Sequence, residues 1–313
     1  MSRNDNHAAE TQPRGAALTD EAFSKQLGGF QRKQALYTAV AVAGILGCIT
    51  AALLFHELVL AAVLFAVAAA GIALGSGMQK KKKALIRSRL GGEFDAELAQ
   101  RFGPEPQTPE LPIDEAYLRA SRLTGRVWEK CSIRNFHEGV YRGVRFSAAN
   151  ALLEHTYQTW HPHDGQVTNT AKMLDGVVIR CRTALRAPAR VSVRGRIEPE
   201  EPDVIRTASA DFDRRFITES ESQSAALTLL TPTLLQALTE LEKSFRDELA
   251  GLIWEEDTLT LAFNTRYVFA DVPDALDTRD IGDLRKWYTA SLNGMCFALD
   301  TLMKSTSVLG THE

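Results

Sequence analysis

The chain has few cysteines and none of the short motifs that identify common catalytic or metal sites. Its four cysteines are scattered singly along 313 residues and form no C-x-x-C pair: Cys48, Cys131, Cys181 and Cys296. A disulfide framework or a cysteine-based zinc site is therefore not expected. The patterns of a P-loop, G-x-G-x-x-G, G-x-S-x-G, S-x-x-K and H-E-x-x-H are also missing. The motifs thus predict no cofactor and no recognisable active site.

An excess of positive charge is missing as well. The chain holds 36 Lys and Arg against 39 Asp and Glu, and residues 113–313 hold 24 against 29. Because binding to nucleic acid needs an excess of Lys and Arg to neutralise phosphates, nucleic acid is not an expected partner.

Two neighbouring stretches contain no charged residue at all. Residues 35–55 and residues 58–78 are apolar, and only His56 and Glu57 separate them. As helices, each would be about 31 Å long at 1.5 Å per residue, which matches a bilayer core of about 30 Å. A buried hairpin of a soluble core or a cleaved signal peptide fits less well, because both runs are long and a polar segment, residues 1–34, precedes them. The sequence therefore predicts a transmembrane helical hairpin over residues 35–78.

Basic residues lie at the two outer ends of this hairpin and not at its tip. Arg32 and Lys33 precede it, and a cluster follows it: Lys80, Lys81, Lys82, Lys83, Arg87 and Arg89. By the positive-inside rule, both termini are expected in the cytoplasm, with the hairpin in the cell (inner) membrane. The four lysines are also expected to contact anionic lipid headgroups.

Small residues recur along both apolar stretches at a spacing of four. They allow helices to approach closely in a membrane, either within the hairpin or in an oligomer, and the sequence leaves both open. They are Ala39, Ala43, Gly47 and Ala51 in the first stretch, and Ala62, Ala66, Ala70, Gly71 and Gly75 in the second.

The remaining boundaries follow from glycine and proline. Residues 1–34 are expected to be largely disordered, with a short helix that starts after Thr19 and stops at Gly28-Gly29. Residues 79–112 are predicted to form a basic juxtamembrane helix, interrupted at Gly91-Gly92, and a proline-rich spacer over 103–112. A cytoplasmic domain would then occupy 113–306, followed by a tail, 307–313.

The fold class predicted for 113–306 is α+β, a mostly antiparallel sheet packed with helices. Alternating apolar residues predict strands, and apolar residues at helical spacing predict helices. Thr231-Pro232 forms a typical helix start. The expected strands are 126–134, 141–159, 176–183, 190–197, 215–219, 252–254, 258–263 and 267–269, and the expected helices are 113–123, one from Pro232 and 277–304.

A histidine cluster lies at the expected tip of a long hairpin. His155, His161, His163 and Asp164 could ligate a transition metal. Pro162, Asp164 and Gly165 are equally typical of an ordinary exposed turn. The second interpretation is favoured, and no metal site is predicted.

Arginines occupy even positions on two expected strands. Arg180, Arg182, Arg194 and Arg196 alternate with apolar residues, so they are expected to share one sheet face. Such a face could be solvated and paired with carboxylates. The sharper hypothesis is a surface for anions or anionic lipid, which would act together with Lys80 to Lys83.

Several segments resemble a bacterial family of membrane-anchored proteins that is defined only by a domain of unknown function. The similar segments are Tyr141-Arg142-Gly143 with Phe146 and Glu154, Asp211 to Phe216, Ala225 to Pro232, and residues 254–269. The family has Phe-Lys-Gly where this chain has Leu174-Asp175-Gly176. The resemblance implies two transmembrane helices followed by a cytoplasmic α+β domain, with a strand at Asp211 to Phe216, and it supplies no catalytic or ligand residue.

These observations favour a non-enzymatic membrane protein whose cytoplasmic domain is a binding or scaffolding module. Its expected partners are the lipid bilayer, anionic headgroups, and a second copy or another membrane protein. An enzyme acting on a membrane-proximal substrate is the alternative, because active sites are recognised by geometry rather than by sequence order. A small pore or transport subunit fits less well, because the apolar helices carry no charge.

Overall fold

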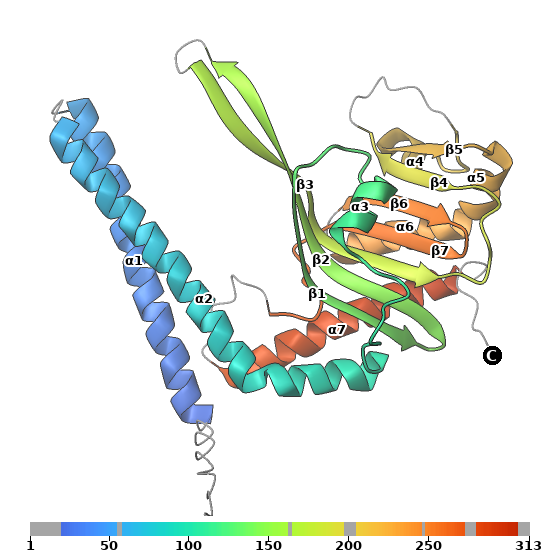
Figure 1. The fold of residues 1–313 in the computed structure, drawn as a ribbon, viewed down its shortest axis with the longest axis horizontal. Coiled ribbons are helices and arrows are strands. Elements are labelled where there is room, and N and C mark those ends of the chain that lie inside the picture. The colour runs from blue at the N-terminus through green and yellow to red at the C-terminus, as the bar shows by residue number, and fades with distance from the viewer. Residues whose placement is uncertain are drawn as a thin grey trace, which may run out of the picture. The chain divides into compact units, whose positions relative to one another are not determined.

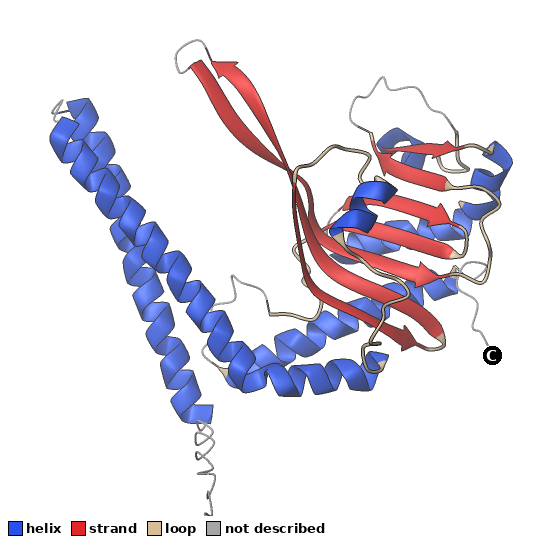
Figure 2. Cartoon of the chain, viewed as in Figure 1, coloured by secondary structure: helices blue, strands red, loops and turns tan. Residues whose placement is uncertain are grey.

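The computed structural model describes residues 20–54, 58–161, 165–196, 205–245, 248–272 and 280–305. It confirms the α+β class, with two long helices followed by an antiparallel sheet and further helices (Figure 2). The chain forms two compact units, Met1–Arg89 with Ala275–Arg285, and Leu90–Asp274 with Lys286–Glu313. The division falls within two continuous helices, α2 and α7.

The first unit contains the two long apolar helices, α1 (Asp20–Leu54) and α2 (Leu58–Phe102). An 18-residue window in each has a mean hydropathy of 2.0 or 2.3, and only 17% of either window is buried. A core helix of a soluble protein would be mostly buried, whereas these helices expose large side chains such as Leu53, Val59 and Phe65. The two helices therefore indicate a membrane-anchored protein.

Small residues hold the two helices together. A Cβ atom at Gly44 would lie 3.0 Å from the Leu64 carbonyl oxygen, and one at Gly71 would lie 3.0 Å from the Tyr37 carbonyl oxygen. Ala41, Ala51, Ala61 and Ala68 are buried in the same region. Part of the predicted small-residue pattern thus serves the hairpin, whereas Ala39, Ala43, Ala62, Ala66 and Ala70 are exposed.

The predicted helix stops at Gly28-Gly29 and Gly91-Gly92 are wrong. α1 and α2 run through both pairs without a break. A glycine inside a helix costs about 1 kcal/mol relative to alanine. Burial of Phe23 and Leu27, and of Leu90 and Phe94, outweighs this cost, since a buried large apolar side chain contributes about 1.5–3 kcal/mol.

The second unit is built on one seven-stranded antiparallel sheet in the order β1-β2-β3-β7-β6-β4-β5 (Figure 1). Its strands are β1 (Lys130–Tyr141), β2 (Val144–His161), β3 (Gly165–Arg182), β4 (Val191–Gly195), β5 (Phe216–Ser220), β6 (Glu248–Glu255) and β7 (Thr258–Asn264). The last three pairs of β2 and β3 before the turn are Thr159↔Val167, Trp160↔Gln166 and His161↔Gly165, so the two strands form a long hairpin.

Helices cover both faces of this sheet. α3 (Glu115–Ser121) lies on one face, and α6 (Pro232–Phe245) and α7 (Ile281–Lys304) lie on the other (Figure 1). α4 (Ala210–Arg215) and α5 (Gln223–Leu229) flank β5 in the chain. The Thr231 hydroxyl accepts the Leu234 N–H at 3.2 Å, which confirms the predicted helix start. The predicted start of the last helix lies outside the described residues.

The face under α3 has its own apolar core. Leu118, Leu123 and Trp128 pack there against sheet residues that include Val178, Ile253 and Ala262. Val177 and Val178 are both fully buried, so β3 is covered on two faces at this point. Simple alternation of buried and exposed positions therefore fails in the middle of β3.

Two expected strands are absent from the places predicted. Tyr267 to Phe269 forms no strand. Instead, the Asn150 side-chain amide donates to the Phe269 carbonyl oxygen and accepts the Phe269 N–H, at 2.8 Å each. The segment from Asp211, expected as a strand from the family resemblance, begins as helix α4. Ser209 caps this helix by accepting the Phe212 N–H, and β5 starts only at Phe216.

The second unit starts earlier in the chain than the predicted domain 113–306. The end of α2 packs along α7, where the Phe94 and Tyr288 rings stack with centroids 3.9 Å apart. Leu111, in the proline-rich segment, is fully buried, and its N–H donates to the buried Glu138 carboxylate at 2.8 Å. Residues 90–112 therefore contribute to the core of the sheet unit.

Candidate functional site

The register of the sheet places the arginines of β3 and β4 on one face. Arg180 lies opposite Thr260, Thr260 opposite Ile253, and Ile253 opposite Ser192. Residues opposite one another in an antiparallel sheet share a face. Because side chains alternate along β4, Arg194 lies on the same face as Ser192, and Arg190 immediately precedes the strand in the same phase. This is the face that α3 partly covers.

On β3 the arginines have protein partners. The Arg180 guanidinium lies 4.1 Å from the centroid of the Tyr117 ring of α3, and it donates to the Pro112 carbonyl oxygen at 3.0 Å. Arg182 pairs with Asp257 at 2.5 Å. Burial raises the pKa of Tyr117, and the pKa of Asp257 is lowered because its bonds to Arg182 outweigh the effect of burial. Arg180 therefore links β3 to α3 and to the segment before it, and Arg182 links β3 to the turn between β6 and β7.

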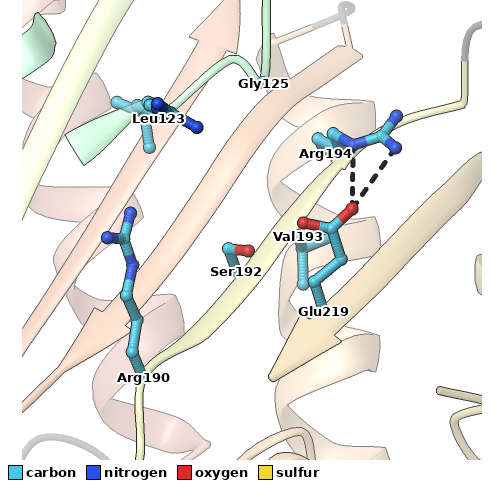
Figure 3. Close-up of a pocket in the computed structure, with 8 residues that line it drawn as sticks. Leu123, Gly125, Arg190, Ser192, Val193, Arg194 and Glu219 are labelled. Atoms are coloured by element: carbon cyan, nitrogen blue, oxygen red, sulfur yellow. Dashed lines mark hydrogen bonds and ion pairs between the residues drawn. The ribbon is translucent and has the colours of Figure 1, made fainter. Parts of the chain in front are cut away.

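On β4 the arginines border an open pocket of about 490 Å³ (Figure 3). We call it the arginine pocket. Ser192 lies between Arg190 and the ion pair of Arg194 with Glu219, which is 3.3 Å long. The residues that line the pocket are Arg122, Leu123, Gly125, Arg190, Ser192, Val193, Arg194 and Glu219.

The segment after α3 forms one wall of this pocket. Arg122 ends the helix in the left-handed conformation, with φ 54°, and Gly125 has φ 63°. A Cβ atom at Gly251 of β6 would lie 1.9 Å from the Leu123 carbonyl oxygen, so only glycine lets the wall lie directly on the sheet. The Arg190 side chain donates to the Ser121 carbonyl oxygen and ties the opposite rim to the end of α3.

The charge of the arginine pocket is unbalanced. Among the residues that the structure describes, three arginines line it with one acidic residue, Glu219. Guanidinium groups bind phosphate and carboxylate through paired N–H donors, and a volume of this size suits a small ligand. The arrangement can therefore hold an anion.

A neighbouring pocket of about 450 Å³ shares the same wall segment through Thr124 and Arg126. Arg196 lines it and donates to the Asp213 and Phe216 carbonyl oxygens at 2.8 and 3.4 Å. Here Arg215 binds both carboxylate oxygens of Glu242, at 3.0 and 2.8 Å. Among the described residues, five basic side chains (Arg126, Lys172, Arg196, Arg214 and Arg215) and two acidic ones (Glu242 and Glu248) line this second pocket, so it too has an excess of positive charge.

The remaining predicted site residues lie elsewhere. Lys80 to Lys83 are in α2 within the first unit, whereas the four predicted arginines are in the second. Contact of either group with lipid stays a prediction. To reach headgroups, Arg180 and Arg182 would have to exchange the protein partners that they have here.

The histidine hairpin is only partly described. His155 Nδ1 lies 2.8 Å from the Glu129 carboxylate, whose other oxygen accepts the Thr156 N–H at 2.7 Å. The His161 side chain, His163 and Asp164 lie outside the described residues. Within the described part of the chain, no group of three or more His, Cys, Asp or Glu side chains could hold a metal ion.

The strongest pKa shifts belong to core residues outside the arginine pocket. Burial raises the pKa of Cys181 to about 12, and it also raises the pKa of Tyr267. Both groups are therefore protonated at neutral pH.

Comparisons with known proteins identify no family for this chain and give one weak structural similarity. No family model and no curated protein matches the chain. Among solved structures, the crystal structure of the mycobacterial trehalose monomycolate transport factor A, TtfA, is similar at 13% sequence identity, over 59% of this chain and 78% of that chain. The TM-score is 0.28, and we draw no functional conclusion from it.

Of the residues that line the arginine pocket, only Arg194 is among the site residues predicted from the sequence; Arg122, Arg190, Ser192 and Glu219 are not. Arg122 follows a seven-residue helix, and nothing in its neighbourhood marks it as facing β4. Glu219 belongs to the predicted strand 215–219. The sequence does not indicate that this strand pairs with β4, where Arg194 lies opposite Ile217, so it does not bring Glu219 close to Arg194.

Proposed function

We propose that this chain is a membrane-anchored binding protein whose α+β unit holds a phosphate-bearing anion in the arginine pocket. The observation that supports the proposal most directly is that, among the described residues, Arg122, Arg190 and Arg194 line one open pocket with one acidic residue, Glu219. The proposal refines the broader expectation of a membrane-proximal binding module.

Phosphate fits the pocket better than a carboxylate does. Glu219 already pairs with Arg194. A carboxylate ligand would bring Arg194 the same single negative charge that Glu219 already supplies. A phosphate dianion has three acceptor oxygens and a larger charge, so it can bind Arg122 and Arg190 while Arg194 stays partly shared.

The membrane anchor and its flanking charges define where the pocket would work. Arg32, Lys33 and the Lys80 to Lys83 cluster favour a cytoplasmic location for both termini and the sheet unit. The phosphate could then belong to a soluble metabolite or to a lipid headgroup of the inner leaflet. The lipid-contact hypothesis for Lys80 to Lys83 and for Arg180, Arg182, Arg194 and Arg196 belongs to the second case.

Binding to the full-length protein in neutral detergent tests the proposal. Isothermal titration with inorganic phosphate should give saturable binding that R190Q and R194Q each weaken about ten-fold or more, since a hydrogen bond to a charged group contributes about 1.5–3 kcal/mol. R186Q is the matched control: Arg186 is exposed, pairs with Glu256 at 3.4 Å and lies outside the arginine pocket.

Nanodiscs with and without anionic lipid separate the two sources of phosphate. If a headgroup is the ligand, anionic lipid should compete with free phosphate in the parent and not in the R190Q/R194Q double variant. Absence of saturable phosphate binding by the parent, or an equal loss in R186Q and R190Q, would overturn the proposal.

A further inference from the structure

The long hairpin of β2 and β3 extends beyond the rest of the sheet. We call residues 154–161 and 165–172 the arm. β1 pairs with β2 only as far as Lys130↔Glu154, and β7 pairs with β3 only as far as Gly176↔Asn264. Within the arm the two strands pair only with each other, and Figure 1 shows them projecting from the sheet.

Such an arm is a weak structure on its own. A two-stranded ribbon in water is marginally stable at best, and each of its edges presents unpaired backbone groups. Proteins usually protect such edges with lysine, proline or inward-pointing charges. Between His155 and His161, and between Gly165 and Ala171, the arm has no Asp, Glu, Lys, Arg or Pro. Half of these residues instead favour strands: Thr156, Tyr157, Thr159, Trp160, Val167, Thr168 and Thr170.

The two edges of the arm differ at their base. On the β2 edge, the Glu129 carboxylate accepts the Thr156 N–H at 2.7 Å and contacts His155 at 2.8 Å, so a side chain guards this edge. On the β3 edge, Lys172 pairs with Asp175 at 2.6 Å, and from Ala171 to the turn no charged side chain follows among the described residues. The β3 edge is therefore the one that is left open to a further strand.

We infer that the β3 edge of the arm pairs with the same edge of a second copy of this chain. An antiparallel pair of identical strands satisfies twofold symmetry, so the contact closes as a dimer. The product is a four-stranded sheet with β3 of each copy at its centre. Thr168 and Thr170 would then face the partner's β3 as neighbouring cross-strand side chains, a pairing that stabilises sheets.

Two large side chains of the arm are exposed, Trp160 to 76% and Tyr157 to 42%. They lie on opposite faces of the ribbon, because they are three residues apart. Both are on β2, which is the outer strand of the four-stranded sheet, so the second copy places no strand directly beside them. This inference does not depend on the proposed anion site.

Cysteine cross-linking of the full-length protein in membranes tests the contact. T168C places a thiol on the β3 edge, and a short bis-maleimide should produce a covalent dimer above the background of the four native cysteines. T228C is the matched control: Thr228 is exposed on α5 in the same unit. Cross-linking of T168C no stronger than that of T228C would overturn the inference.

Charge variants test the same edge without cross-linking. T168K/T170K and T168E/T170E should each lose the dimer, because like charges would meet across the new strand pair. Mixing the two should restore a heterodimer, which a merely misfolded arm would not do. Dimerisation unchanged in both variants, or protection of T168C from labelling without a cross-linked dimer, would show that something other than a second copy occupies this edge.

Discussion

Two adjoining regions of one sheet face carry arginines of the same phase and use them differently. On β3, the Arg180 guanidinium contacts the Tyr117 ring and donates to the Pro112 carbonyl oxygen, so other groups of the protein already bind it. On β4, Arg190 and Arg194 border an open pocket beside the end of α3, where Arg190 donates to the Ser121 carbonyl oxygen and Arg194 pairs with Glu219. The difference arises from what covers each strand and not from the strands themselves. An even spacing of arginines is therefore evidence of a shared face, and only the covering layer decides which of them can meet a ligand.

The wall between the two regions depends on one glycine. In G251A, the new methyl group would meet the Leu123 carbonyl oxygen at 1.9 Å and push the segment after α3 away from the sheet. We expect a loss of about 1–3 kcal/mol in the free energy of unfolding, as in other overpacked cores, together with loss of phosphate binding. Denaturant titration and calorimetry measure the two effects. G195A is the control, because a Cβ atom there meets nothing within 4 Å.

The covered arginine should matter for stability and not for binding. R180Q removes the cation–π contact with Tyr117, which contributes about 0.5–2 kcal/mol, and the bond to Pro112. The free energy of unfolding should fall by about this amount while the phosphate affinity stays at the parent value. If R180Q keeps the parent's stability but loses phosphate binding, Arg180 on β3 does not differ in role from the arginines of β4, and the comparison is wrong.

In the pocket itself, Glu219 should oppose the ligand. E219Q removes the carboxylate that pairs with Arg194 at 3.3 Å, so more of this guanidinium becomes available to an anion. Because Glu219 is about half exposed, the gain should be about 0.5–1 kcal/mol, or two- to five-fold in affinity. Weaker phosphate binding in E219Q, measured at the same ionic strength, would contradict this role.

The smallest effect concerns the β3 ion pair. The pKa of Asp257 is lowered by Arg182 from its ordinary value of 3.8, so the pair stabilises the folded state above that pH and loses its contribution as the pH falls through the folded-state pKa. D257N should therefore cost less than about 1 kcal/mol at pH 6 and nothing once the pH is well below 3.8. A difference that persists unchanged in strong acid would show that packing, and not charge, causes it.

Much of this arrangement could be predicted from the sequence, and the missing part has a physical cause. Alternation placed Arg180 and Arg194 on one face, and two uncharged runs placed the membrane hairpin. Coverage by α3 could not be predicted, because it depends on contacts such as that of Tyr117 with Thr260, 2.6 Å between hydroxyls that are far apart in the chain. Nor could the pocket wall, since Gly251 looks like any strand glycine until the Leu123 carbonyl is placed above it.

The earlier start of the sheet unit has the same origin. Four prolines in residues 103–112 are typical of a linker, yet Leu111 is buried and the Glu138 carboxylate holds its N–H. The sequence does not reveal this contact, because Glu138 lies 27 residues from Leu111 in the chain and the fold brings the two together.

Locating a bound anion tests the central claim most directly. Crystals of the protein soaked in tungstate, a heavy tetrahedral oxyanion, would reveal its position by anomalous scattering. The account predicts tungstate among Arg122, Arg190 and Arg194, and no density there in the R190Q/R194Q variant. Tungstate at Arg126 and Arg196 or along Lys80 to Lys83, with the arginine pocket empty, would contradict it.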